Sequence, residues 1–148
     1  MLNLSENAIK YQIMKKVFVA GLVAGVVLLI LSVLGLYMTI WFFPAIASQY
    51  FDPAFDTGSG KVMLYYVHPF VISMALSWFW SRFKEVLTGS FLTRGIEFGI
   101  IYVLIATLPM MLLIYSAMNV SLTMIFTWLI LALAQGITGG LIFEKINP

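Results

Sequence analysis

Cysteine is absent from the 148-residue chain, and charged residues make up only 9% of it. The absence of cysteine excludes disulfides, thiolate metal sites, iron–sulfur clusters and thioether attachment of haem. Hydrophobic residues make up 62% of the chain, and the mean hydropathy is +1.03. So few polar residues cannot cover the surface of a water-soluble globule, and the composition therefore predicts an integral membrane protein.

Motifs for catalysis and for nucleic-acid binding are also missing. The sequence contains no Gly-rich phosphate loop, no paired acidic cluster within an apolar run and no strongly basic stretch. Its one histidine, His68, has no Cys, Asp, Glu or second His in the same apolar run to complete a metal shell. We therefore predict no catalytic residue, no metal site, no cofactor and no nucleic-acid partner.

Four long apolar runs occupy nearly the whole chain. About 20 mainly apolar helical residues cross the roughly 30 Å hydrocarbon layer of a bilayer. The runs lack strand-like alternation, and the hydrocarbon offers no water to backbone groups, so each run predicts a helix. The expected spans are residues 17–43, 62–81, 91–116 and 121–143. The predicted fold is all-α: a single domain over residues 1–148, built as an antiparallel bundle of four transmembrane helices.

Basic residues lie mostly on one side of this predicted topology. Of the eight Lys and Arg residues, only Lys61 flanks the runs on the side opposite the N-terminus. The other seven are Lys10, Lys15, Lys16, Arg82, Lys84, Arg94 and Lys145. Because cytoplasmic flanks carry the excess of Lys and Arg, we expect both termini to be cytoplasmic. The pattern is typical of small four-span proteins of the bacterial inner membrane, and we expect that location.

The N-terminal segment, residues 1–16, precedes the first run. A Lys-rich start, an apolar run and the small residues Ala45 and Ala47 together imitate a cleaved secretory signal. The hydrophobic core of such a signal has roughly 7–15 residues, so the much longer run here predicts a retained anchor. Ser5 is placed to cap a helix, and the segment is expected either to lie on the cytoplasmic interface or to extend the first helix.

Glycines recur at four-residue spacing in three of the runs. The pairs are Gly21 with Gly25, Gly95 with Gly99, and Gly136 with Gly140. At about 1.5 Å per residue, each pair lies roughly 5–12 Å from the cytoplasmic end of its helix. Small residues let helix backbones approach closely, so the pattern predicts a tight waist in the cytoplasmic half of the bundle.

Glu97 and Gln135 are expected at the depth of this waist, each beside a glycine pair. We predict that they form a polar clamp by hydrogen bonding between the third and fourth helices. The alternative for Glu97 is a protonatable carboxyl in a proton or cation path. Arg94 favours the clamp, because it lies three residues earlier on the same helical face and can pair with the carboxylate.

The other half of the bundle is expected to be more open. Pro69 and Pro109 interrupt the backbone hydrogen bonding of the second and third helices there. Splayed helices would leave an outward-facing crevice, and small-molecule sites commonly form between helices. The candidate ligand-binding residues are Tyr37, Trp41, Tyr65, His68 and Trp128. In the alternative interpretation, the aromatic residues fill this space as ordinary belt and core side chains.

His68 has two interpretations of its own. Within the membrane, an imidazole is a candidate proton relay, quinone contact or axial haem ligand. The residue before a proline is pushed away from helical angles, however. In the second interpretation, the regular helix therefore begins at Pro69 and His68 caps it.

Two connections lie on the outer side of the predicted bundle. The first, residues 44–61, is expected to contain a short interfacial helix over residues 45–51 that ends at Asp52 and Pro53. It is a candidate lid over the crevice, a surface that faces a partner, or an aromatic loop that only anchors the chain. The second, residues 117–120, is too short to separate its helices, so the third and fourth spans should form an antiparallel hairpin.

Three classes of function remain. The first is a non-catalytic structural or accessory component, self-associated or attached to a larger membrane complex, and the small-residue faces favour it. The second is a binder or carrier of a small apolar ligand, such as a lipid or a quinone-like molecule, in the crevice. A transporter and a membrane enzyme are less favoured, because an even number of spans gives no inverted repeat and the chain has no nucleophile–base pair. The expected partners are the lipid bilayer and either a second copy of the chain or a larger complex.

Overall fold

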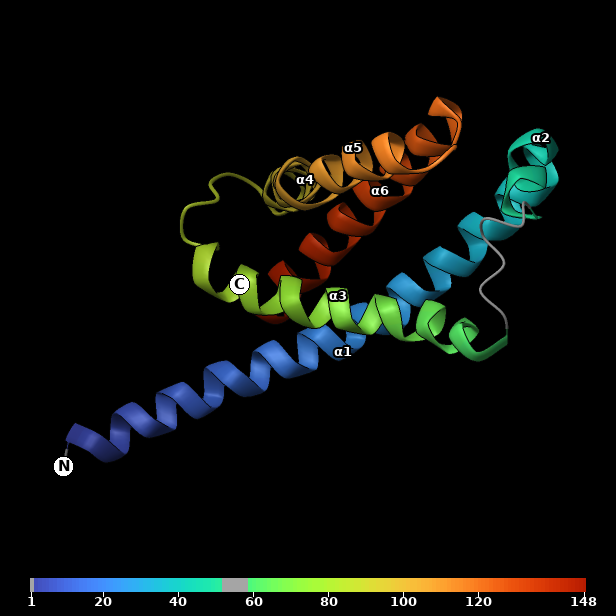
Figure 1. The fold of residues 1–148 in the computed structure, drawn as a ribbon. Coiled ribbons are helices and arrows are strands. Elements are labelled where there is room, and N and C mark those ends of the chain that lie inside the picture. Colours follow the sequence, from blue (N-terminus) through green and yellow to red (C-terminus); the bar gives the residue numbers. More distant parts are fainter. Residues whose placement is uncertain (1, 52–58) are drawn as a thin grey trace.

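A computed structural model describes residues 2–51 and 59–148, and every regular element in these residues is helical (Figure 1). Four helical spans are long and apolar enough to cross a membrane. They are α1 (Leu2–Phe42), α3 (Val62–Phe83), the continuous run α4 (Phe91–Tyr102), η4 (Val103–Thr107) and α5 (Leu108–Ala117), and finally α6 (Leu122–Ile146). The prediction of an all-α fold with four such helices is confirmed.

The helix ends differ from the predicted spans by a few residues at most places and by more at the N-terminus. α1 begins at Leu2, so the N-terminal segment extends the first helix, and Ser5 lies inside α1 rather than at its cap. A helix of 41 residues is about 60 Å long, roughly twice the thickness of the hydrocarbon layer. α6 continues to Ile146 through Glu144 and Lys145, since charged residues alone do not end a helix and a lysine in the last turn suits the helix dipole.

Pro109 produces a local irregularity in the third span. Proline has no N–H group to donate to the carbonyl four residues earlier. The chain accommodates it with the π-helical turn η4, in which the N–H of Leu108 donates to the carbonyl of Val103, five residues back. Helical structure then continues as α5, so the proline alters the hydrogen-bonding pattern without breaking the span.

The four spans form two hairpins. α1 packs along α3, α4 packs along α6, and α1 also lies against α6 and so joins the hairpins (Figure 1). Both ends of the chain and the connection over residues 84–90 lie at one end of the molecule, here called the base. The connections after α1 and after α5 lie at the other, here called the open end. The short connection between α5 and α6 gives the predicted antiparallel hairpin.

The helix predicted after the first span is present. α2 (Pro44–Ala47) begins with Pro44 in its first turn, where a missing N–H costs nothing, and the 3₁₀ turn η1 (Ser48–Phe51) follows it. The predicted end at Asp52 and Pro53 lies outside the described residues. A further 3₁₀ turn, η3 (Ser59–Lys61), leads into α3.

Aromatic rings form the core at the base. Trp80 of α3, Phe98 of α4 and Phe143 of α6 are buried, with ring centroids 5.2 Å apart for Trp80 and Phe98 and 5.9 Å apart for Phe98 and Phe143. Both pairs meet edge to face, the arrangement that the ring quadrupoles favour. Trp80 also donates from Nε1 to the carbonyl oxygen of Asn147 at 3.0 Å. The core therefore ties three helices and the residue after α6 into one unit.

An ion pair lies beside this core. Arg94 of α4 pairs with Glu144 of α6, donates to the carbonyl oxygen of Lys84 at 2.9 Å and stacks 5.4 Å from the ring centroid of Trp80. The paired side chains are only 17% and 12% exposed. The expectation that Arg94 pairs with Glu97 is wrong, because α6 continues beyond its predicted end and brings the carboxylate of Glu144 to Arg94.

A row of serines on α3 fastens it to α1. Ser73 and Ser77 are buried and donate to the carbonyl oxygens of Gly21 at 2.9 Å and Val17 at 2.8 Å. Such bonds between helices are worth about 0.6 kcal/mol each in a membrane. The next serine in the row, Ser81, makes no bond to α1 in the described structure and donates to a carbonyl of its own helix.

We expect Ser77→Ala to lower the free energy of unfolding by about 0.6 kcal/mol, because it removes one hydrogen bond between helices and little volume. Ser81→Ala is the matched control and should leave stability unchanged, since its bond stays within α3. Unfolding in mixed micelles, followed by circular dichroism, measures both variants. Equal losses in the two variants would contradict the role given to Ser77.

Candidate functional site

The glycines of α4 and α6 lie directly opposite one another. A Cβ atom placed on Gly136 would lie 3.0 Å from the Cα of Gly99, and one placed on Gly140 would lie 3.1 Å from the Cα of Gly95. A Cβ atom on Gly140 would also lie 2.9 Å from the carbonyl oxygen of Gly95, and one on Gly99 would lie 2.6 Å from the backbone nitrogen of Ile137, so a side chain at either position would push the two backbones apart.

Gly21 and Gly25 make a different contact. A Cβ atom on Gly21 would lie 2.5 Å from the sulfur of Met74, and one on Gly25 would lie 2.6 Å from the ring of Phe70, so both glycines face α3. The glycines therefore lie in two separate contacts, one within each hairpin, rather than at a waist shared by three helices. In each case the small-residue face is covered by the chain's own neighbouring helix.

Gln135 bonds to α1 rather than to α4. It is buried, and its Nε2 donates to the Oγ of Ser32 at 2.9 Å, while Ser32 donates to the carbonyl oxygen of Leu28 at 2.8 Å. This polar contact joins the two hairpins in the half of α1 that leads toward α2. Both residues are otherwise surrounded by apolar helices, where an unpaired amide would be costly.

The predicted bond between Gln135 and Glu97 is not formed among the described residues. Glu97 is partly exposed and lies beside a shallow groove with Thr93 and Ile100. Glu97 lies two residues from both Gly95 and Gly99, which is about 200° around the helix. Because the glycines face α6, the carboxylate of Glu97 points away from it.

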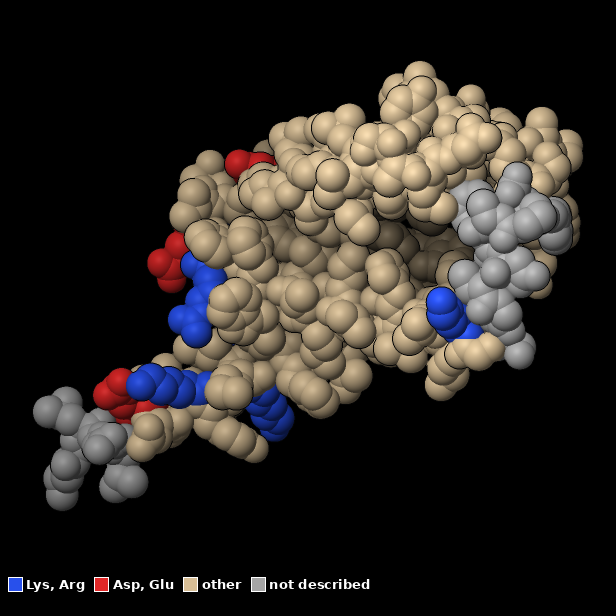
Figure 2. Space-filling model, in the orientation of Figure 1, with Lys and Arg blue, Asp and Glu red and all other residues tan. Residues whose placement is uncertain are grey.

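A crevice opens between the two hairpins, toward the open end. Its volume is about 340 Å³, within the range of small-molecule sites. Figure 2 shows a hollow in the surface between the hairpins, toward the open end. The apolar part of its lining comes from α1 and α6 and includes Leu36, Ile130, Leu131 and Ala134.

Polar groups lie along the rest of the lining. Trp128 of α6 donates from Nε1 to the phenol oxygen of Tyr50 in η1 at 2.6 Å. Tyr65 of α3 donates from its phenol to the carbonyl oxygen of Ser32 at 3.1 Å, and Thr39 donates to a carbonyl within α1. Burial raises the pKa of Tyr50 more than the hydrogen bond from Trp128 lowers it, so this phenol is neutral at physiological pH. Among the described residues, the lining of the crevice therefore carries neutral hydroxyl and indole groups and no charged side chain.

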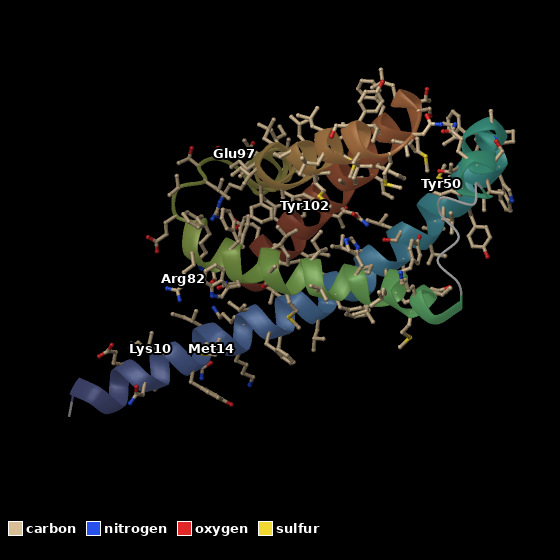
Figure 3. All side chains as sticks on the ribbon, in the orientation of Figure 1. Lys10, Met14, Tyr50, Arg82, Glu97 and Tyr102 are labelled. Atoms are coloured by element: carbon tan, nitrogen blue, oxygen red, sulfur yellow. The ribbon has the colours of Figure 1, made fainter. Side chains whose placement is uncertain are left out.

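The connection after α1 closes one end of the crevice. Ile46 of α2 packs with Met124 and Ile125 of α6 in a small apolar cluster, against which Tyr50 and Trp128 also lie. Figure 3 shows Tyr50 at the open end, where η1 approaches α6. This contact, together with the bond between Trp128 and Tyr50, holds η1 in place as one wall of the site.

Two of the five predicted ligand residues line the crevice, namely Tyr65 and Trp128. Tyr37 and Trp41 lie on an exposed face of α1, 54% and 75% exposed, with ring centroids 6.4 Å apart. His68 is exposed and does not line the crevice.

The expectation that a regular helix begins at Pro69, capped by His68, is wrong. α3 begins at Val62 and contains Pro69 as a buried residue. Proline disfavours helical angles in the residue before it but does not forbid them.

The sequence predictions missed Ser32 and Thr39, and they included Tyr50 only as part of the candidate lid over residues 45–51. Ser32 and Thr39 stand seven residues apart in the otherwise apolar run over residues 17–43, with Gly35 between them, and this spacing puts all three on one face of a helix. That polar stripe was the available signal. Tyr50 offered no comparable signal, because its position depends on how η1 packs against α6.

Comparison with known proteins adds no family to this description: no family model, no curated protein and no solved structure matches the chain.

Proposed function

We propose that the chain is an integral protein of the bacterial inner membrane with both termini in the cytoplasm and the base on the cytoplasmic side. The described Lys and Arg side chains gather at the base, with Lys61 as the exception, and this distribution supports the orientation (Figure 2). Large apolar side chains are exposed on all four spans, for example Ile30, Val71, Leu112 and Ile130. Lipid would cover such a surface, whereas in water it would drive association.

Within the membrane, the proposed role is the non-catalytic binding or carriage of one small, mainly apolar ligand, such as a lipid or a quinone-like molecule. The crevice of about 340 Å³ is the observation that carries this proposal. An apolar pocket with a few convergent polar groups is the usual form of a small-molecule site. Its apolar lining suits a hydrocarbon body, and the hydroxyl oxygens of Tyr65 and Thr39, which donate their own hydrogens within the protein, can accept a hydrogen bond from a hydroxyl head group.

A structural or accessory role, the first expectation from the sequence, now has less support. That expectation depended on small-residue faces available for association with another chain. Here Gly21 and Gly25 face α3, while the glycines of α4 and α6 face each other. The faces that favoured association are therefore occupied within the chain.

Filling the crevice tests the proposal. Ala134 is an exposed residue of its lining, so Ala134→Phe adds a ring to the cavity without displacing a buried neighbour. We expect the wild-type protein, purified in nanodiscs from bacterial membranes, to retain one apolar compound detected by mass spectrometry. The Ala134→Phe variant should lose at least about nine-tenths of it, since loss of the cavity removes most of the binding surface.

Ala75→Phe is the matched control. Ala75 is exposed and lines a different groove of about 350 Å³ between α3 and α4, where the lining is almost entirely apolar. This variant should retain the compound. Retention by Ala134→Phe, or recovery of a larger protein in place of any small molecule, would overturn the ligand-binding proposal, and the second result would favour the accessory role.

A further inference from the structure

α1 and α3 separate from each other toward the base. Ser73 and Ser77 reach the backbone of α1, but the hydroxyl of Ser81, one turn farther along the same face, donates to the carbonyl oxygen of Trp78 at 2.7 Å. A serine that faced α1 at the same separation would have the carbonyl of Ile13 as its partner, four residues before Val17. The change of partner marks the point where the two helices move apart.

The separation of α1 and α3 leaves a groove between them. Its volume is about 550 Å³, larger than the crevice at the open end. Met14 and Phe18 of α1 and Met74 and Trp78 of α3 supply an apolar floor. Lys10 and Arg82 also line the groove, and Figure 3 shows Lys10 and Met14 on the projecting part of α1 and Arg82 at the neighbouring end of α3.

The two cations have little of their charge neutralised by the protein. Lys10 pairs with Glu6 at 2.8 Å, but both side chains are about two-thirds exposed, and such pairs are weak and easily exchanged. Arg82 is exposed and lies 5.6 Å from the ring centroid of Trp78, and in the described part of the chain it has no carboxylate partner. The groove therefore combines a cationic mouth with an apolar floor.

We infer that this groove binds an anionic phospholipid, with the phosphate at Lys10 and Arg82 and an acyl chain along Met14, Phe18 and Met74. The guanidinium of Arg82 presents the planar set of donors that suits phosphate oxygens, and stacking on Trp78 orients it. Tryptophan is favoured at the level of lipid head groups, and anionic lipids are attracted to basic residues at the cytoplasmic surface. The inference depends on the proposed membrane orientation but not on the ligand of the crevice.

Native mass spectrometry of the detergent-purified full chain tests this inference, with dioleoyl phosphatidylglycerol and dioleoyl phosphatidylcholine as probes. We expect the wild type to bind the anionic lipid more tightly than the zwitterionic one. Arg82→Gln should weaken binding of phosphatidylglycerol about fivefold, and the double variant Lys10→Gln/Arg82→Gln about 30-fold. Lys15→Gln, which removes the same charge from a residue of α1 outside the groove, should leave binding unchanged.

Three results would overturn the inference. Equal weakening by Lys15→Gln would assign the binding to the general charge of α1 rather than to the groove. Equal binding of the two lipids would remove the role of the cationic mouth. Displacement of the lipid by millimolar inorganic phosphate would identify a site for a free anion in which the acyl chain contributes nothing. Unchanged circular dichroism and size-exclusion profiles establish that each variant is folded. These variants should still retain the ligand of the crevice, so that loss of lipid binding at the groove can be distinguished from failure of the proposed function.

Discussion

Replacing Gly99 with leucine is expected to lower the free energy of unfolding by about 3 kcal/mol or more. The reason is the backbone contact between α4 and α6. A Cβ atom at this position would lie 2.6 Å from the backbone nitrogen of Ile137 and 3.0 Å from its Cα. Backbone atoms within a helix cannot rotate away as a side chain can, so the two helices must separate and lose the packing on both sides of the contact.

Unfolding of the variant in mixed micelles, compared with the wild type, measures this loss. Gly60→Leu is the matched control, because a Cβ atom at Gly60 would have no neighbour within 4 Å among the described residues. That substitution should change the free energy of unfolding by less than about 0.5 kcal/mol. If Gly99→Leu were as stable as Gly60→Leu, the close approach of α4 and α6 would not exist in the folded protein.

Replacing Arg94 with methionine should also be strongly destabilising, by about 3–5 kcal/mol. The substitution leaves Glu144 as an unpaired carboxylate at a site where its side chain is only 12% exposed. It also removes the bond to the carbonyl of Lys84 and the stacking on Trp80, so the connection between α3 and α4 loses its anchor. The expected change is a cooperative loss of structure at a lower denaturant concentration.

A double-mutant cycle separates the ion pair from its surroundings. Arg94→Met/Glu144→Leu removes both charges and should be more stable than Arg94→Met alone, because no unpaired carboxylate is left buried. The exposed pair of Lys10 and Glu6 is the control, and Lys10→Met should cost less than about 0.5 kcal/mol. A cost for Arg94→Met no larger than that of Lys10→Met would contradict the buried pairing.

The helices themselves could be predicted from the sequence because their signals are local. A charge-free run of 20 or more residues has few alternatives to a helix in a membrane, and Pro44 marks the start of α2 by its own geometry. The hairpin of α5 and α6 followed from the length of the connection. Each of these predictions needed only neighbouring residues.

The pairing of side chains could not be predicted in the same way. Gln135 bonds to Ser32, which lies 103 residues away, and nothing local indicates that α6 crosses α1 at that point. Arg94 pairs with Glu144, which lies 50 residues away, and nothing local indicates that pairing either. The orientation of Glu97 is a different case, because its angle from Gly95 and Gly99 was available in the sequence and points it away from α6.

The π-helical turn η4 changes which residues of the third span face the other helices. A turn closed by a bond to the fifth residue back holds one residue more than an α-helical turn, so everything after it is out of phase by about 100°. In a regular α-helix, the residues seven and eleven positions after Gly99 would lie on the same face as Gly99. These residues are Ala106 and Met110, and both are exposed. The residues turned inward are Thr107 and Met111, each one place later. An alignment with any four-helix protein whose third span is regular therefore needs a one-residue gap in this turn, without which every inward position of α5 is assigned to the wrong side chain.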